Sequence, residues 1–231
     1  MAQPVARPDL QASDGLPVVE TFHSLQGEGM HMGRSAFFIR LGGCSVGCHW
    51  CDTKHSWPQA VHPQRSLNEI ALQAAEAATQ GAAFVVITGG EPLHHPLDDL
   101  CEALNAEISS RMEAPLPLHL ETSGVDPLSG NFAWITLSPK RHKPPTTELL
   151  AQCDELKVVV HQAEDIGFAQ AMATQAAQAR SDRKPSTPSN LALLLQPGHD
   201  CPEGQQLAID FVKANPQWRL SLQTHKLLGV R

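Results

Sequence analysis

The chain has 231 residues, a length that predicts one domain with a sizeable buried core. Its formal net charge of −7 argues against nucleic-acid binding, because nucleic-acid binders carry an excess of Lys and Arg. No apolar run approaches the ~20 residues that span a bilayer, so we expect no membrane association. Residues 1–17 contain no stretch typical of a signal peptide and are predicted to form a flexible leader, with a single domain over residues 18–231.

Strands and helices are predicted to alternate along the chain. Residues 66–81 are expected to form a helix, because Ser66 and Glu69 make a capping box and Gly81 provides a stop. The apolar run at 83–88 is typical of a strand buried on both faces of a parallel sheet. Further strands are expected at 18–24, 36–42, 117–122, 134–139, 155–161, 191–197 and 218–224, and further helices at 96–110, 163–179 and 202–214. The polar segment 180–190 is predicted to be a loop.

Repeated strand–helix units predict an α/β fold with a mostly parallel sheet and right-handed crossovers, either open or curled towards a barrel. In such sheets ligands gather beyond the carboxyl ends of the strands. Polar motifs follow five of the predicted strands, namely TGGEP, ETSG, SPK, QPGH and QTHK. The sequence therefore predicts that one edge of the sheet carries the chemistry.

Six cysteines are present, and three of them lie in the stretch CSVGCHWC. The other three, Cys101, Cys153 and Cys201, are scattered singly, which is not the pattern of a secreted disulfide framework. This usage fits a reducing compartment, and we expect a cytoplasmic protein.

The cysteine triplet, Cys44, Cys48 and Cys51, allows three interpretations from its spacing. The first is a structural zinc loop with His49 or His55 as the fourth ligand. The second is a redox dithiol formed by Cys48 and Cys51, which leaves Cys44 without a role. In the third, three thiolates hold three irons of a [4Fe–4S] cluster and leave the fourth iron open to a ligand.

The triplet, with an aromatic residue before its last cysteine, resembles the signature of the radical S-adenosylmethionine superfamily. The motif GGEP after an apolar strand matches the Gly-Gly-Glu motif of that superfamily. The resemblance implies that Trp50 lies against the adenine, and that Gly90 and Glu91 meet the methionine amino group. Glycine lets a ligand approach the backbone, and a carboxylate pairs with an ammonium group.

The stretch FHSLQGEGMHMGRSAFFIRLGGC narrows the resemblance to the 7-carboxy-7-deazaguanine synthases, together with CDT, TGGEP, ETSG, SPK, QPGH and QTHKLLGVR. The resemblance implies that Thr53 binds Mg²⁺ and that the substrate is 6-carboxy-5,6,7,8-tetrahydropterin. The implied substrate-binding residues are Leu25, Gln26, Gly27, Glu28, Arg40, Thr88, His225 and Arg231. The implied S-adenosylmethionine-binding residues are His49, Trp50, Gly90, Glu91, Ser123, Ser138, Pro139, Lys140, Gln196, Pro197, Gly198 and His199.

The implied reaction is a radical ring contraction that yields 7-carboxy-7-deazaguanine and ammonia, on the route to queuosine and other deazapurines. The fold that accompanies it is a partial, modified TIM-like barrel, consistent with a chain shorter than the ~250 residues of a full barrel. The resemblance also implies a homodimer and a flavodoxin or ferredoxin as electron donor.

Three other functions remain open at this level. A glycyl-radical activating enzyme shares the cysteine signature but acts on a protein backbone, so it does not need Gln26, Glu28 and Arg40. An iron–sulfur electron carrier ordinarily uses four cysteines per cluster. A zinc-stabilised interaction module does not need glycine-rich motifs at several strand ends.

Overall fold

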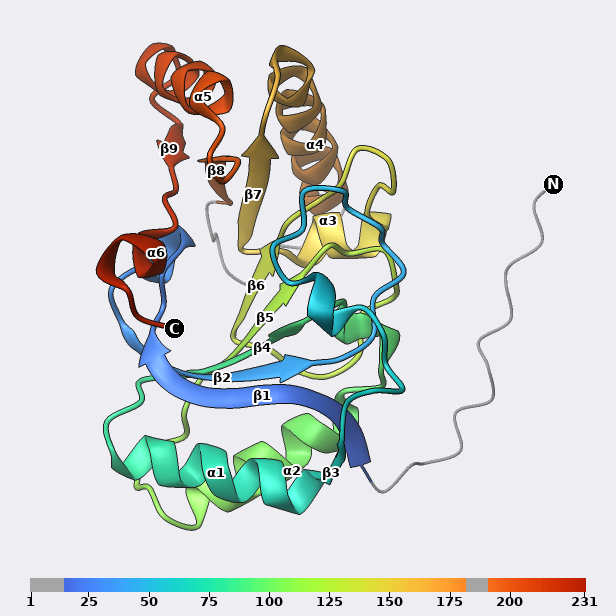
Figure 1. The fold of residues 1–231 in the computed structure, drawn as a ribbon, viewed down its shortest axis with the longest axis vertical. Helices are drawn as coiled ribbons and strands as arrows, with labels where there is room; N and C mark the ends of the chain where they lie inside the picture. Colours follow the sequence, from blue (N-terminus) through green and yellow to red (C-terminus); the bar gives the residue numbers. More distant parts are fainter. Residues whose placement is uncertain (1–14, 182–190) are drawn as a thin grey trace, which may run out of the picture.

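The fold was obtained as a computed structural model, which describes residues 15–181 and 191–231. Nine strands in this part of the chain form one sheet, shown in Figure 1. They are β1 (Gly15–Leu25), β2 (Ser35–Leu41), β3 (Gln64–Ser66), β4 (Val85–Gly89), β5 (Leu118–Thr122), β6 (Trp134–Leu137), β7 (Glu155–Val160), β8 (Ala192–Pro197) and β9 (Trp218–Leu220).

The sheet order is β3-β1-β2-β4-β5-β6-β7-β8-β9. Strand β2 and the six strands from β4 to β9 run parallel. At one edge, β1 pairs antiparallel with both β2 and β3. The edge strands β3 and β9 are not paired with each other, so the barrel is partial and not closed. The predicted α/β class with a mostly parallel sheet in a partial barrel is therefore confirmed.

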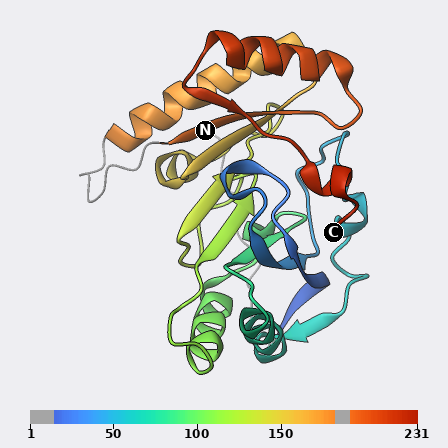
Figure 2. The same cartoon turned by 90° about the vertical axis from the view of Figure 1, so that its left-hand side faces the viewer.

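Helices cover the outer face of this curved sheet, as Figures 1 and 2 show. Helices α1 and α2 pack together beside β1 and β2, whereas α4 and α5 lie against β7 and β8. The bounds are α1 (Leu67–Thr79), α2 (Asp98–Ser109), α3 (Thr147–Gln152), α4 (Ala163–Ser181), α5 (Pro202–Ala214) and α6 (Thr224–Leu228). Three short 3₁₀ helices complete the described structure: η1 (Gly29–His31), η2 (Lys54–Ser56) and η3 (Pro92–His94). No helix in the described ranges is long and apolar enough to cross a membrane.

The alternation of side chains along each strand separates the core from the inner face of the sheet. On β2, Phe37, Ile39 and Leu41 belong to the large core under the helices, and Arg40 projects to the other side. On β7, Leu156, Val158 and Val160 enter the same core. Lys157, at an alternate position of β7, lines a cavity on the inner face. The core therefore holds the sheet rigid while its opposite face remains available for polar side chains.

Helix α1 begins as its sequence predicts, because the Ser66 side chain accepts a hydrogen bond from the Glu69 N–H at 3.2 Å. The Glu69 carboxylate pairs with Arg65 at 3.3 Å. The sequence therefore located the first turn correctly, including one half of the expected capping box.

Several predicted boundaries need correction. The strand expected at 218–224 ends at Leu220, and residues from Thr224 form α6, because the chain turns there to hydrogen-bond the Gly27 carbonyl. Residues 15–17 belong to β1 and pair with β3, so they are not part of the expected leader. Helix α4 extends to Ser181, so residues 180 and 181 are helical and do not belong to the loop expected at 180–190. Residues 1–14 and 182–190 lie outside the described residues. Strand β3 and helix α3 are too short to have left a periodic pattern.

Candidate active site

The predicted polar motifs converge at the carboxyl ends of the parallel strands. Gly42, Gly43 and Cys44 follow β2, Gly90 and Glu91 follow β4, and Ser123 follows β5. Ser138 follows β6, whereas Gly198 and His199 follow β8. These loops line one open cavity of about 220 Å³. The strand-end motifs therefore meet at one edge of the sheet, around one cavity.

The three clustered thiols all line this cavity, and none of them is in a disulfide. Burial raises the pKa of the Cys44 thiol, and the backbone N–H groups of Val46 and Gly47 partly oppose that rise. Burial also raises the pKa of Cys48, against the effect of the nearby Lys140 ammonium. Lys140 is itself half-buried, and the loss of solvent around its ammonium group lowers its pKa. The site thus combines soft sulfur ligands with a neighbouring cation that stabilises thiolates.

The three thiols fit an iron–sulfur cluster better than one metal ion. A single zinc ion needs its ligands to converge on a point about 2.3 Å from each sulfur. Within the described ranges, no group of three His, Cys, Asp or Glu side chains is placed in that way. Three free thiols that line one cavity fit an iron–sulfur cluster in number and chemistry, because soft thiolates are its usual ligands.

Most of the residues expected to bind S-adenosylmethionine share this cavity. Its lining includes Trp50, Gly90, Glu91, Ser123, Ser138, Lys140, Gln196, Pro197, Gly198 and His199. His49 and Pro139 line a neighbouring pocket instead, together with Trp50 and Lys140. The Trp50 ring lies 5.0 Å from the His161 ring and 4.5 Å from the His49 ring, measured between centroids. His161 is a lining residue that sequence reasoning missed.

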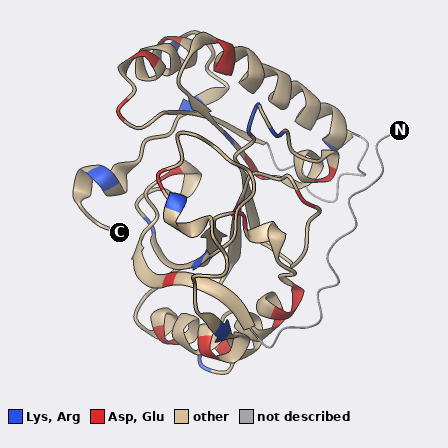
Figure 3. Ribbon diagram, turned by 45° about the vertical axis from the view of Figure 1, so that its right-hand side comes forward, with Lys and Arg blue, Asp and Glu red and all other residues tan. Residues whose placement is uncertain are grey.

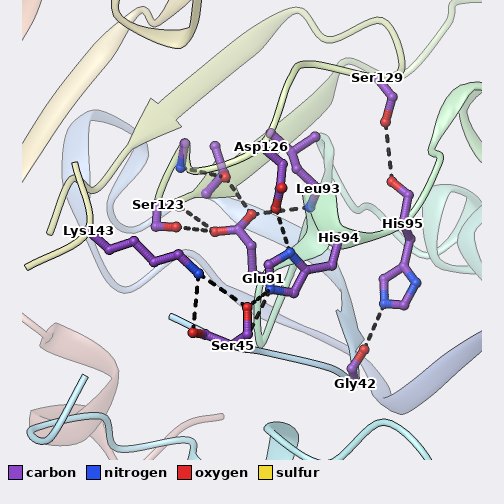
Figure 4. Close-up of polar contacts among 12 residues, drawn as sticks. Gly42, Ser45, Glu91, Leu93, His94, His95, Ser123, Asp126, Ser129 and Lys143 are labelled. Atoms are coloured by element: carbon purple, nitrogen blue, oxygen red, sulfur yellow. Dashed lines mark hydrogen bonds and ion pairs between the residues drawn. The ribbon is translucent and has the colours of Figure 1, made fainter. Parts of the chain in front are cut away.

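Glu91 is almost fully buried, with 1% of its surface exposed, and its carboxylate is held from several sides (Figure 4). One oxygen accepts hydrogen bonds from the Thr122 hydroxyl at 2.6 Å and from the Leu93 N–H at 3.1 Å. The other accepts from the N–H of Ser123 at 2.8 Å and from the Ser123 hydroxyl. Such a fixed carboxylate beside the cysteine loop can receive an ammonium group without reorganising.

Gly90 permits the close approach of the two loops that carry Glu91 and Cys44. A Cβ atom on Gly90 would lie 2.4 Å from the carbonyl oxygen of Gly43 and 2.8 Å from Cβ of Cys44. The Glu91 N–H donates to the same Gly43 carbonyl at 2.9 Å. Only glycine fits between these two backbones.

A second cavity adjoins the first and contains every residue expected to bind the substrate. Its lining includes Leu25, Gln26, Gly27, Glu28, Arg40, Thr88, His225 and Arg231. Glu28, Thr53, Thr88 and Glu121 line both cavities, so they mark the border between them. Arg40 and Thr88 are register partners on the parallel strands β2 and β4, which places both on the inner face.

An ion pair between Glu28 and Lys157 lies at this border. The two side chains are directly bonded, and Gln223 donates a second hydrogen bond to Glu28 at 2.8 Å. Burial alone would raise the pKa of Glu28, but the Lys157 ammonium and these hydrogen bonds lower it to about 2. Burial disfavours the charge on Lys157, but Glu28, Glu121 and Glu155 together raise its pKa above the ordinary value. Glu28 is therefore an ionised acceptor at neutral pH.

The Gln26 side chain is buried and oriented by two hydrogen bonds. Its amide group donates to Glu121 at 2.9 Å, and its amide oxygen accepts from the Glu28 N–H at 3.2 Å. Gly27 packs against His225, because a Cβ atom at this position would lie 2.2 Å from Nδ1 of His225. The LQGEG segment therefore presents its polar groups in one fixed arrangement.

Arg40 and the chain end approach each other through Glu20. The Glu20 carboxylate pairs with Arg40 at 2.9 Å and with the Arg231 guanidinium at 3.4 Å. The backbone oxygen of Arg231 accepts from the Ser24 hydroxyl at 2.7 Å. Residue 231 thus lines the second cavity through contacts with β1.

Residues near the C-terminus also tie this cavity to the cysteine loop. Lys226 on α6 pairs with Asp52 at 2.8 Å and donates to Gln223 at 2.9 Å. The neighbouring Thr53 places its hydroxyl 3.5 Å from the Cys51 sulfur. Figure 3 shows basic residues on α6 and η2 near these loops, while acidic residues are spread over the outer helices. The lining of the first cavity itself carries both acidic and basic side chains, such as Asp52 and Lys157.

Sequence reasoning missed Lys157 as a lining residue, and it gave no binding role to Glu121, Gln223 and Asp52, which lie in the ETSG, QTHK and CDT motifs. A signal was present for Lys157, because a lysine interrupts the otherwise apolar run of β7. The other cysteines have no place here: Cys101 and Cys153 are buried in the core, and Cys201 caps α5. Burial raises the pKa of Cys101 to about 11 and that of Cys153 to about 12, so both stay protonated.

Comparison with known proteins agrees with this site. The model of the Radical SAM superfamily matches residues 38–137, from within β2 to the end of β6, and this range includes the cysteine loop and β4. The fold and the site therefore define a radical SAM enzyme, and the superfamily implies a [4Fe–4S] cluster and S-adenosylmethionine as cofactors.

Relatives over nearly the whole chain narrow the class. The chain is 56% identical to the 7-carboxy-7-deazaguanine synthase of Prochlorococcus marinus over 93% of this chain and 98% of the relative. It is 46% identical to the synthase of Synechocystis sp., with 93% of both chains covered. The crystal structure of QueE from Escherichia coli matches with a TM-score of 0.71 at 31% identity, over 90% of this chain and 93% of that one. The chain belongs to the 7-carboxy-7-deazaguanine synthase family. The alternatives of an activating enzyme, an electron carrier and a zinc module find no support in these matches.

Proposed function

We propose that the chain converts 6-carboxy-5,6,7,8-tetrahydropterin to 7-carboxy-7-deazaguanine with release of ammonia. The observation that carries this proposal is the second cavity, where all eight residues expected to bind the pterin meet beside the thiols. A pterin presents amide and amine groups along one edge and a carboxylate elsewhere, so it needs acceptors, donors and a cation. The second cavity offers all three kinds of group.

In this proposal Cys44, Cys48 and Cys51 hold the cluster, and the residues beyond β4, β5, β6 and β8 hold S-adenosylmethionine. When bound, the two cofactors supply one-electron chemistry that activates an unreactive C–H bond. Glu91 would receive the methionine ammonium on a carboxylate that is already fixed by four donors. Trp50 would lie against the adenine, and the backbone near Gly90 would allow close approach.

On the substrate side, Glu28 acts as the acceptor for the guanidine-like nitrogens of the pterin. Lys157 and Gln223 keep its carboxylate ionised and oriented, which its pKa of about 2 reflects. Arg40 binds the pterin carboxylate, since a guanidinium can donate two parallel hydrogen bonds. Gln26 is oriented for a ring-edge contact, and His225 closes the cavity against Gly27.

We further propose that Thr53 helps to bind Mg²⁺ near the substrate carboxylate. Its hydroxyl lies at the border of the two cavities, beside the last cysteine. Mg²⁺ keeps several waters and prefers oxygen ligands, so one hydroxyl needs the substrate to complete the coordination. We therefore expect Mg²⁺ affinity to depend on the bound substrate.

The biological setting completes the proposal. The single sheet that runs from β1 to β9 supports one domain. Six free cysteines support a reducing, cytoplasmic location. We also propose a homodimer and a flavodoxin or ferredoxin as reductant, both of which follow from the family resemblance.

The test is an anaerobic turnover assay on iron–sulfide-reconstituted protein with dithionite, S-adenosylmethionine, Mg²⁺ and 6-carboxytetrahydropterin, read by mass spectrometry. We expect 7-carboxy-7-deazaguanine to form and to disappear in the Cys48→Ala variant. Release of 5′-deoxyadenosine without a deazaguanine product would show that the substrate is wrong while the cofactor chemistry stands. Stoichiometric zinc with neither product would overturn the proposal at the three cysteines.

A further inference from the structure

The LQGEG segment, residues 25–29, is held at successive residues by the part of the chain that follows β9. The Gln223 side chain donates to the Glu28 carboxylate at 2.8 Å. The Gly29 N–H donates to the Ser221 hydroxyl at 3.0 Å. Figure 1 shows α6, which comes directly after these residues, beside the end of β1. The segment that lines the second cavity therefore depends on contacts with residues near the C-terminus.

Ser221 differs from the other residues of this contact, because its hydroxyl also reaches β8. Ser221 is 3% exposed, and its N–H donates to the Leu195 carbonyl at 2.9 Å, which continues the pairing of β8 with β9. The Ser221 hydroxyl donates to Oε1 of Gln196 at 2.9 Å. Gln196 lies on β8 and lines the first cavity. One buried hydroxyl therefore connects a residue of the first cavity with the segment that lines the second.

The direction of these two hydrogen bonds fixes the orientation of the Gln196 amide. A backbone N–H is always a donor, so the Ser221 hydroxyl accepts from Gly29 and has its own proton left to donate. Among the described residues, Oε1 of Gln196 is the only acceptor within hydrogen-bond distance of that hydroxyl. Oε1 of Gln196 therefore faces Ser221. No described residue accepts a hydrogen bond from Nε2 of Gln196, so this donor is available to a ligand in the first cavity.

Glu155 holds the same segment by a second contact. The Met30 N–H donates to Oε2 of Glu155 at 2.9 Å, and Glu155 is 1% exposed. A Cβ atom on Gly29 would lie 2.3 Å from Oε1 of Glu155, and the φ angle of Gly29 is +68°, so only glycine fits here. The peptide groups on both sides of Gly29 are therefore held, one by Ser221 and one by Glu155. This arrangement fixes the backbone that carries Glu28.

We propose that Ser221 is a positioning residue for both ligands: it orients the Gln196 amide as a donor to S-adenosylmethionine and fixes the backbone that carries Glu28 towards the pterin. Removal of the hydroxyl leaves the Gly29 N–H and Oε1 of Gln196 without partners, so both groups should shift. Loss of one side chain should therefore weaken two ligands that bind in different cavities. The inference rests on the proposed function, because it takes the pterin as the ligand of the second cavity.

The experiment measures equilibrium binding of S-adenosylmethionine and of 6-carboxytetrahydropterin to the reconstituted holoprotein without oxygen. The test variants are Ser221→Ala and Gln196→Met, since methionine keeps the length of glutamine without its donor and acceptor. The matched control is Ser66→Ala. The Ser66 hydroxyl also accepts a backbone N–H, that of Glu69 at 3.2 Å, but it lies at the start of α1 outside both cavities. This variant therefore controls for the loss of stability that follows the loss of a serine hydroxyl.

We expect Ser221→Ala to weaken both ligands by roughly threefold to tenfold. Gln196→Met should weaken S-adenosylmethionine by a similar factor and leave the pterin affinity within about twofold. In the Gln196→Met background, Ser221→Ala should have no further effect on S-adenosylmethionine and should still weaken the pterin. An equal loss of S-adenosylmethionine affinity in both backgrounds would overturn the proposal. Losses in Ser221→Ala no larger than those in Ser66→Ala would also overturn it.

Hydrogen exchange of the cluster-free chain tests the contact with Gly29 without any ligand. We expect the peptide covering residues 27–31 to exchange at least about tenfold faster in Ser221→Ala than in Ser66→Ala. Unchanged exchange would overturn the inference. A wild-type protein that binds S-adenosylmethionine but not the pterin would instead overturn the proposed function. If Ser221→Ala does not fold, Ser221→Cys replaces it with the same expectations, because a thiol fills a similar space and is a weaker donor and acceptor.

Discussion

Replacement of Lys157 by Met should destabilise the protein in a pH-dependent way. The Lys157 side chain is 7% exposed and that of Glu28 18%, so solvent screens their ion pair weakly. The pKa of Glu28 lies at about 2, compared with an ordinary value of 4.5. This difference corresponds to roughly 3 kcal/mol of folding free energy. Most of it depends on the charge of Lys157, and methionine has a similar shape without that charge.

The sign of the pH dependence follows from the lowered pKa. A carboxylate whose pKa is lower in the folded state contributes stability above about pH 4.5, and that contribution is lost as the pH falls towards 2. The wild-type chain should therefore lose roughly 1 kcal/mol from this group between pH 7 and pH 3.5. In Lys157→Met, burial is left to raise the pKa of Glu28, so this loss should be absent.

The assay is urea denaturation of the cluster-free chain at several pH values. We expect Lys157→Met to be about 3 kcal/mol less stable than wild type at pH 7, with a difference that shrinks as the pH falls. Lys213→Met, at an exposed position in the last turn of α5, is the control and should change stability by less than about 0.5 kcal/mol. A Glu28→Gln and Lys157→Met double-mutant cycle measures the coupling directly. A pH-independent difference, or no coupling, would refute the reasoning.

Three further predictions concern the two cavities. Arg40→Met should weaken binding of the pterin by roughly 10- to 100-fold, because a charge-assisted hydrogen bond to the pterin carboxylate is lost. Calorimetric titration checks this, with Arg65→Met as control. An unchanged affinity of Arg40→Met for the pterin would contradict the prediction. Gly27→Ala should raise the KM for the pterin about tenfold, since its Cβ would lie 2.2 Å from Nδ1 of His225 and displace that ring. A change in S-adenosylmethionine affinity with an unchanged KM for the pterin would contradict a role of His225 in the substrate cavity. Gly90→Ala should destabilise the chain by about 1–3 kcal/mol and reduce iron retention, because its Cβ would lie 2.4 Å from the Gly43 carbonyl. A melting experiment checks this, with Gly167→Ala as control. At Gly167 nothing lies within 4 Å of an added Cβ, so this variant should be neutral or stabilising.

The site was predicted in outline because its residues occupy predictable places on parallel strands. Each strand of a parallel sheet ends at the same edge, so motifs such as TGGEP and QPGH meet without any knowledge of strand order. The members of the cysteine triplet share one cavity because they lie close together in the sequence, in the loop that follows β2. All eight expected substrate-binding residues line the adjoining cavity.

The residues that were missed depend on which way a side chain points. Lys157 stands in an apolar run, and only the register of β7 shows that it projects onto the inner face beside Glu28. The strand expected at 218–224 was too long and helix α6 was not predicted, because three strand residues and about one and a half helical turns leave too short a pattern to recognise. His49 and Pro139 line a pocket beside the expected one.

The sequence by itself determined the order of strands and helices, the cysteine spacing and the family of the protein. Those properties depend on local patterns of polarity, turn residues and motif spacing. Only the tertiary structure decided which distant groups are paired, such as Glu28 with Lys157 or the Ser24 hydroxyl with the Arg231 backbone. The physical reason is that sheet curvature and register bring these groups together, and neither leaves a trace in the spacing of residues along the chain.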